Sequence, residues 1–288
     1  MTFKSVSIKN LVTVGFLSLS VALASCTDAD KGVKGNSAED ANLFQKKNIT
    51  SFHLSGTKKI ALTYDDGPTP GVTDELLDVL RQYNIKATFF ILGASVRGQE
   101  KTLERMRADG HVIANHSYSH QNLREKVYER DADALWKQIV GSDKQIAPYM
   151  NPAHKKYFRA PYGAWNATHA DKLNAIPQAA EYIGPVFWDA GGEITPRGTR
   201  PRSASEITTA ADWDCWTANS KKGIYPLSVD VCGAGYYKEI SRKQGGVVLM
   251  HDKKIQTVQM SAKLIPKLIA EGYEFITVDD IRAMEQYQ

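Results

Sequence analysis

The sequence lacks several features that would direct it to a specialised class of protein. Its 288 residues carry a net charge of only +4 and no dense stripe of lysine and arginine, so nothing in it indicates a nucleic-acid partner. Its apolar run Leu11–Leu23 is too short to span a bilayer comfortably. No internal repeat is present, which argues against a repeat architecture. The apolar fraction, 42%, is typical of an ordinary globular chain.

The first residues, 1–26, have the pattern of an export signal. Lys4 and Lys9 precede the apolar run, which ends in the small residues Ala24 and Ser25 followed by Cys26. This ending resembles a bacterial lipoprotein signal, in which the cysteine is acylated and becomes the new N-terminus. The alternative is an ordinary secretory signal cleaved near the same point. Both interpretations predict export to a bacterial periplasm or cell surface, and lipidation of Cys26 adds a membrane anchor.

Residues 27–57 are predicted to be a flexible tether, because polar residues without helical or strand periodicity predominate from Thr27 to Asn48. One folded domain is expected over 58–288. An insertion near 190–211 interrupts it and is richest in Thr, Ser, Pro and Arg over Thr195–Ala211.

Two cysteines remain after Cys26, namely Cys215 and Cys232. In an oxidising compartment they are expected to pair, and such a bridge is worth about 3 kcal/mol in the chain-entropy picture. The alternative is two buried free thiols. Their spacing does not match a metal site that they would form together.

From Lys58 onward, short apolar strands alternate with amphipathic helices. The predicted strands are Ile60–Tyr64, Ala87–Leu92, His111–Ala114, Tyr157–Ala160, Pro185–Trp188, Gly246–Met250 and Tyr273–Thr277. The predicted helices are one capped by Thr73, then Gln99–Asp109, Glu129–Ile146, Gly235–Lys243, Ala262–Glu271 and a terminal helix. This alternation predicts an α/β fold with a parallel sheet, and its extent suits a barrel.

Polar residues that can take part in chemistry follow these strands at their carboxyl ends. They are Asp65, Asp66, His116, His120, Arg159, Tyr162, Asp189, His251 and Asp252. Because the carboxyl ends of parallel strands meet at one edge of the sheet, this is the edge where sites are built.

His116 and His120 lie four residues apart, so on a helical turn they share a face and can bind one metal ion. Such a pair alone is more often two surface histidines. Beside a strand-end carboxylate it provides the two histidines and one acid of an open catalytic zinc site. No Glu follows His116, so the HExxH metalloprotease motif is absent.

Four motifs give the chain, from about Lys58 onward, a specific resemblance to a known family. They are Thr63-Tyr64-Asp65-Asp66-Gly67-Pro68, Asn115-His116-Ser117-Tyr118-Ser119-His120, Arg159-Ala160-Pro161-Tyr162-Gly163 and Leu249-Met250-His251-Asp252. The sequence resembles the polysaccharide deacetylases with a NodB-homology domain, the family-four carbohydrate esterases, with Tyr64 where Phe is usual. The resemblance implies a distorted (β/α)-barrel.

The resemblance also implies a role for each residue of the reaction centre. Asp66, His116 and His120 would hold one divalent metal, with zinc preferred and cobalt, manganese or nickel as alternatives. Asp65 would be the general base and His251 the general acid.

Further roles are implied for the residues around this centre. Arg159 would orient the base, and an aspartate would support His251. The family's fourth motif leaves two candidates for that aspartate, since Trp188-Asp189 and Asp212-Trp213 are separated by the insertion. The acetyl group and sugar would be bound by Pro161, Tyr162, Trp188, Trp213 and Leu249, with the backbone N–H of Tyr162 at the oxyanion.

The implied reaction is hydrolytic removal of acetyl groups from N-acetylglucosamine residues of a polysaccharide. The export signal favours peptidoglycan as the polymer. The alternatives are chitin-type oligosaccharide, exopolysaccharide and O-acetylated xylan. A carbohydrate-binding protein that has lost its chemistry is a rival of another class, and the presence of base, ligands and acid argues against it. The oligomeric state is not predicted.

Overall fold

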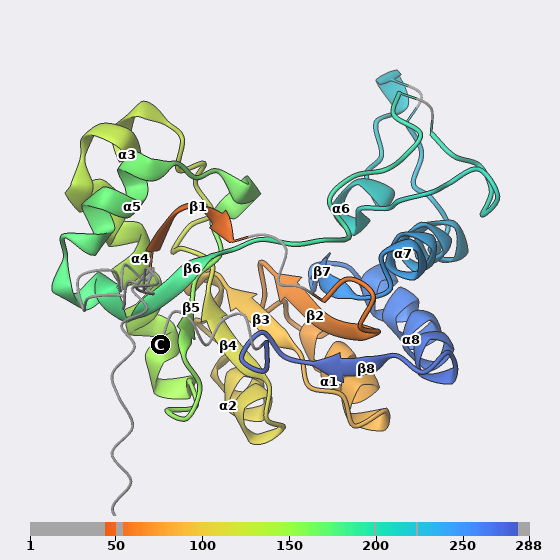
Figure 1. Ribbon diagram of the computed structural model, residues 1–288, viewed down its shortest axis with the longest axis horizontal. Coiled ribbons are helices and arrows are strands. Elements are labelled where there is room, and N and C mark those ends of the chain that lie inside the picture. The colour runs from red at the N-terminus through yellow and green to blue at the C-terminus, as the bar shows by residue number, and fades with distance from the viewer. Residues whose placement is uncertain (1–43, 50–53, 199, 223, 282–288) are drawn as a thin grey trace, which may run out of the picture. The chain divides into compact units, whose positions relative to one another are not determined.

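Parallel strands form two sheets that follow one another around a distorted barrel (Figure 1). The computed structural model describes residues 44–49, 54–198, 200–222 and 224–281. The larger sheet contains, in spatial order, β4 (Val112–Asn115), β3 (Thr88–Ile91), β2 (Lys59–Asp65) and β7 (Gly246–His251), with β8 (Glu274–Ile276) paired to β2. The smaller sheet contains β1 (Phe44–Ile49), β6 (Tyr182–Val186) and β5 (Lys156–Tyr157).

Two isolated parallel bridges connect these sheets. Asn115 pairs with Phe158 between β4 and the end of β5, and Ala190 pairs with Val248 between the segment after β6 and β7. The order β7-β2-β3-β4-β5-β6 therefore returns to β7. The prediction of an α/β barrel is confirmed, and the barrel is distorted because single bridges replace full ladders at these two points.

The helices follow the strands along the chain. They are α1 (Val72–Gln82), α2 (Glu100–Ala108), α3 (Lys126–Arg130), α4 (Ala132–Ile146), α5 (Ala167–Asn174), α6 (Asp212–Cys215), α7 (Val229–Lys243) and α8 (Ile255–Ala270). None of those in the described part of the chain is both long and apolar enough to cross a membrane.

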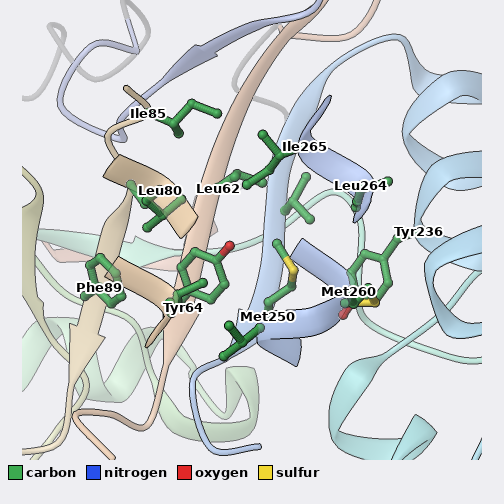
Figure 2. Packing of buried hydrophobic residues seen from close by; sticks show 14 of the residues in the cluster. Leu62, Tyr64, Leu80, Ile85, Phe89, Tyr236, Met250, Met260, Leu264 and Ile265 are labelled. Atoms are coloured by element: carbon green, nitrogen blue, oxygen red, sulfur yellow. The ribbon is translucent and has the colours of Figure 1, made fainter. Parts of the chain in front are cut away.

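The alternation of side chains along β2 explains how an acid comes to lie inside the barrel. Leu62 and Tyr64 belong to a core with residues of α1 and α8, such as Leu80 and Ile265 (Figure 2). Ala61 belongs to a different core, together with Phe90 and Val247 of the neighbouring strands. Since successive side chains point to opposite faces, Thr63 and Asp65 share the inner face with Ala61.

The prediction of a flexible tether over residues 27–57 is wrong for residues 44–49. Phe44–Ile49 forms β1 and pairs in parallel with β6. Phe44 is fully buried, and its ring stacks on Trp165 at a centroid distance of 5.6 Å. Only the two ends of this strand are buried. The four residues between them show no alternation of apolar and polar side chains, so the sequence did not predict a strand here. Residues 1–43 and 50–53, and with them the signal segment and Cys26, lie outside the described residues.

Several helix boundaries also differ from the predicted ones. Thr73 does not cap α1, because the cap position is Gly71 and the Thr73 hydroxyl instead bonds to Thr69 and Asp252. The predicted helix Glu129–Ile146 is divided at Asp131, whose carboxylate accepts two N–H groups at the start of α4.

Other elements start earlier than predicted. α7 begins at Val229, where the Ser228 hydroxyl accepts an N–H, and α8 begins at Ile255. β6 is shifted toward the N-terminus and ends at Val186, and β5 is shortened to Lys156–Tyr157. The predicted terminal helix falls mainly on residues 282–288, which lie outside the described residues.

Candidate active site

The predicted residues meet at the carboxyl ends of the larger sheet. Asp65 is the last residue of β2, His116 directly follows β4, and His251 is the last residue of β7. The backbone is strained here, because Asp66, Ser117, His120 and Tyr162 adopt positive φ angles of 75°, 70°, 56° and 59°. Such conformations cluster at functional sites, where the surrounding structure holds them.

Asp66, His116 and His120 form a cluster that fits a metal ion. One potential ligand atom from each residue lies within 4.8 Å of the others. Oδ1 of Asp66 lies 3.1 Å from Nε2 of His120 and 3.5 Å from Nε2 of His116. This oxygen is buried and has no hydrogen-bond partner. An orphaned carboxylate oxygen facing two imidazole nitrogens is the arrangement that a divalent cation would satisfy.

The tautomer of His116 supports this interpretation. Its Nδ1 lies 2.8 Å from the carbonyl oxygen of Arg159. A carbonyl can only accept, so Nδ1 carries the proton and the lone pair of Nε2 faces the carboxylates. Burial lowers the pKa of His116 to about 3, which keeps the ring neutral. A neutral imidazole is the form that binds metals.

Asp65 is held by a buried arginine. Arg159 Nη1 donates to Asp65 Oδ1 at 2.7 Å and to the Thr63 hydroxyl at 2.8 Å, and its Nε donates to the carbonyl of Val186. The guanidinium also lies 4.0 Å above the ring of Phe90. Burial raises the pKa of Asp65 above its ordinary value, and the charge of Arg159 opposes this. Asp65 Oδ2 remains directed toward the metal cluster, 3.6 Å from His116 Nε2.

His251 forms a second buried pair, with Asp212. Its Nδ1 lies 2.7 Å from Asp212 Oδ1, and its backbone N–H donates to Asp212 Oδ2 at 2.7 Å. The Thr257 hydroxyl donates to the same Oδ2 at 2.8 Å. Burial disfavours the charged imidazole, but the charge and hydrogen bond of Asp212 outweigh it and raise the pKa of His251 to about 9. Nδ1 is committed to Asp212, so Nε2 is the nitrogen left for a proton transfer.

The geometry decides between the two candidate aspartates. Asp189 accepts a hydrogen bond from the backbone N–H of Val247, near the start of β7, and does not contact His251. The prediction of Asp189 as a supporting group is therefore wrong. It failed because β6 ends at Val186, three residues earlier, and the chain then runs parallel to β7, which puts Asp189 beside the start of that strand while His251 lies at its end. Asp212 reaches His251 from α6, beyond the insertion.

A cleft of about 660 Å³ is lined by the metal cluster, by Asp65 and by the His251–Asp212 pair. Four of the predicted substrate-binding residues line it, namely Tyr162, Trp188, Trp213 and Leu249. Pro161 is buried and is not among the lining residues. Tyr162 is 67% exposed, and its ring centroid lies 4.5 Å from that of His120.

Part of the lining was not predicted. Besides Ala160 and Gly192, it consists of residues from the end of α6 and the start of α8, namely Trp216, Thr217, Lys253, Lys254 and Thr257. The two lysines directly follow the motif residue Asp252, which was the one signal in the sequence that could have found them.

The cystine Cys215–Cys232 is present and joins α6 to α7. The two helices also meet through Tyr236, whose hydroxyl accepts from the Asp212 N–H and donates to the Leu249 carbonyl. Trp216 Nε1 donates to Thr257 at the start of α8. The segment after the insertion is thereby fixed against both α7 and β7.

The parallel α/β barrel holds an Asp-His-His cluster, a buried Asp–Arg pair and a buried His–Asp pair. Together these groups have the chemistry of a hydrolase. The sequence profile of the family described as polysaccharide deacetylase matches residues 55–179. The chitooligosaccharide deacetylase of Azorhizobium caulinodans is 33% identical over 215 residues, which cover 74% of this chain and 90% of that protein. The chain therefore belongs to the polysaccharide deacetylase family.

Two further relatives extend the comparison. The peptidoglycan-N-acetylglucosamine deacetylase PgdA of Listeria monocytogenes is 32% identical over 230 residues, which cover 78% of this chain but only 39% of that protein. The chitin deacetylase of the fungus Colletotrichum lindemuthianum superposes with a TM-score of 0.57 at 25% identity, over 83% of this chain and 91% of that one.

Proposed function

We propose that the protein is a metal-dependent N-deacetylase that hydrolyses the acetamide of N-acetylglucosamine residues in peptidoglycan. The observation that carries the proposal is that three distinct groups of side chains meet at one cleft. The orphaned Asp66 with two imidazoles would hold the metal, the Asp65–Arg159 pair supplies a base, and the His251–Asp212 pair supplies an acid.

When bound, a divalent metal supplies Lewis acidity, which polarises a carbonyl and lowers the pKa of water. Zinc suits two nitrogens and one oxygen, and cobalt, manganese or nickel are the alternatives. The remaining steps belong to the side chains. Asp65 accepts a proton as water adds to the acetyl carbonyl carbon, and Arg159 keeps the carboxylate oriented and ionised. The backbone N–H of Tyr162 is our candidate for the oxyanion.

The C–N bond then breaks, and His251 donates its proton to the departing amine. Because Asp212 raises the pKa of His251, the imidazole is protonated at neutral pH and ready to donate. The products are acetate and a glucosamine residue with a free amine.

Peptidoglycan is supported by two observations. The Listeria relative is named as acting on it, and the segment 1–26 predicts export, so the first polymer that the protein meets is the cell wall. The Azorhizobium relative is named for chitooligosaccharide, which makes that substrate the second candidate. We also propose that Cys26 is lipidated and anchors the protein at the membrane.

Acetate release from purified peptidoglycan, chitooligosaccharides and acetylated xylan tests the proposal. Peptidoglycan should give the highest kcat/KM, with a free amine in the product, whereas a free hydroxyl would show O-deacetylation. Asp65→Asn should retain the metal and lower kcat by about 10²–10⁴-fold. Turnover of this variant near that of the wild type would refute Asp65 as the base. Equal and negligible release by both proteins would instead support a carbohydrate-binding protein without activity.

Localisation needs a separate experiment. Metabolic labelling with a fatty acid should mark the wild-type protein and not Cys26→Ala. An unlabelled wild-type protein in the soluble fraction would show that the segment is an ordinary cleaved signal.

A further inference from the structure

The acidic side chains that line the cleft each face a cationic side chain or a pair of imidazoles, whereas its two lysines have no ion-pair partner among the described residues. Asp65 is bound by Arg159, Asp212 is bound by His251, and Asp66 faces the two imidazoles. Lys253 and Lys254 line the same cleft, are exposed, and make no ion pair with any described residue. Two cations therefore face the cleft without an anionic partner from the described part of the chain.

The backbone that carries these lysines is firmly held on both sides. Asp252, immediately before them, is buried and accepts a hydrogen bond from the Thr73 hydroxyl at 2.6 Å. Thr257, three residues after them, is buried between Asp212 and Trp216. The fold therefore sets where the backbone of both lysines lies beside the cleft.

The start of α8 adds positive potential at the same place. Lys254 occupies the cap position of this helix, which has no acidic residue in its first turn and no side-chain cap. The start of a helix carries a partial positive charge that attracts anions, and here it adds to the charge of the two ammonium groups. Trp213, 54% exposed, and Trp216 line the cleft beside them and offer flat apolar surfaces to a sugar ring.

We propose that Lys253 and Lys254 form a binding site for a carboxylate on the sugar next to the N-acetylglucosamine residue that reacts. The inference rests on the proposed deacetylation and names the feature that selects the polymer. A chain made only of N-acetylglucosamine is neutral and offers these lysines nothing. Peptidoglycan carries acids on alternate sugars, either as the carboxylate of a lactyl ether or as the carboxylates of an attached peptide.

The test compares four glycans of equal length. They are strands with bare lactyl carboxylates, the same strands with those carboxylates reduced to alcohols, strands with intact peptides, and chitooligosaccharide. Binding is measured by calorimetry on Asp65→Asn, which separates recognition from turnover, and kcat/KM is measured on the wild type. The bare acidic strand should bind about 3–10-fold more tightly than its reduced form, as expected for two exposed ion pairs. The preference should fall with rising salt.

Lys253→Gln/Lys254→Gln, made in the Asp65→Asn background, should bring the ratio of acidic to reduced binding close to one. Lys101→Gln/Lys137→Gln is the matched control, because it removes the same charge from exposed positions on α2 and α4 outside the cleft lining. This control should keep the full preference. Tighter binding of peptide-bearing than of bare strands would assign the carboxylate to the peptide, and the reverse would assign it to the lactyl group.

Equal binding of acidic and reduced strands would overturn the inference, as would a preference that survives the double substitution. If the peptidoglycan strands are deacetylated in either case, the proposed function stands and only the carboxylate site fails. Absence of acetate release from every glycan would instead remove the proposed function, whatever the binding ratio.

Discussion

The two parts of the cleft are built by different means. The strand-end group, which comprises Asp65, Asp66 and His116, lies at the ends of β2 and β4 within the continuous ladder β4-β3-β2-β7. The helix group, which comprises Asp212, Trp213, Trp216, Thr257 and the two lysines, comes from α6 and the start of α8.

Different forces hold the two groups. Backbone pairing fixes the strand-end group, and each position follows from the strand before it. The helix group depends on side-chain hydrogen bonds and on the cystine between α6 and α7. The candidate base and two of the three candidate metal ligands thus owe their positions to paired strands, whereas His120 lies in the segment after β4. The candidates for tuning the acid and contacting the polymer sit instead on helices that side-chain hydrogen bonds and the cystine hold against β7.

The largest expected effect comes from removing a ligand in the strand-end group. His116→Ala should lose both bound zinc and acetate release, because it removes one of the three side chains that would hold the metal. Elemental analysis of the purified protein measures the metal, with His154→Ala as a control outside the cluster. Undiminished zinc in His116→Ala would contradict the ligand set.

In the helix group, Asp212→Asn should have the next largest effect. His251 must be protonated to donate, so its raised pKa of about 9 keeps it active up to that pH. Without the charge of Asp212, the strongest influence that opposes burial is lost, only the weaker effects of Asp65 and Asp66 remain, and the pKa of the imidazole falls. In the pH profile of kcat/KM, the decline on the alkaline side (the basic limb) should therefore move to lower pH. Turnover at pH 8 should drop about 10²-fold or more.

Asp189→Asn is the matched control for that experiment. It removes the same charge from the other candidate aspartate, which contacts the N–H of Val247 rather than His251. Its basic limb should stay in place. A limb that moves in Asp189→Asn but not in Asp212→Asn would reverse the assignment.

This contrast also explains how far the sequence could be interpreted. Asp65, His116 and His251 were predicted because each directly follows or ends a buried strand, which is a local signal. Asp212 could not be chosen over Asp189, because the choice depends on where the chain returns after the insertion. Lys254 was missed because the predicted helix began at Ala262, seven residues after the observed start of α8.

Replacing both cysteines tests whether the cystine holds the helix group. Cys215→Ser/Cys232→Ser should lower the free energy of unfolding by about 3 kcal/mol, measured with urea. It should also reduce turnover by about tenfold, because α6 carries Asp212 and a loosened α6 weakens the His251–Asp212 pair. Lower stability with unchanged turnover would show that Tyr236 and Thr257 hold Asp212 without the cystine.

The smallest expected effect lies one residue from the base. Tyr64 stands where the family usually has Phe, and its hydroxyl lies 3.1 Å from that of Ser261, in the core under α8. Because Tyr64 is on the outer face of β2, Tyr64→Phe should cost about 0.5–1.5 kcal/mol of stability and leave kcat/KM unchanged.

Thr63→Val changes the neighbouring residue on the inner face, where the hydroxyl accepts from Arg159 and donates to the Val248 carbonyl. It should reduce kcat by about tenfold or more, because it loosens the arginine that orients Asp65. Thermal unfolding and acetate release on the two variants measure both quantities. A loss of turnover in Tyr64→Phe as large as that in Thr63→Val would show that the two faces of β2 do not act separately. In that case the side of the strand would not determine which residues reach the chemistry.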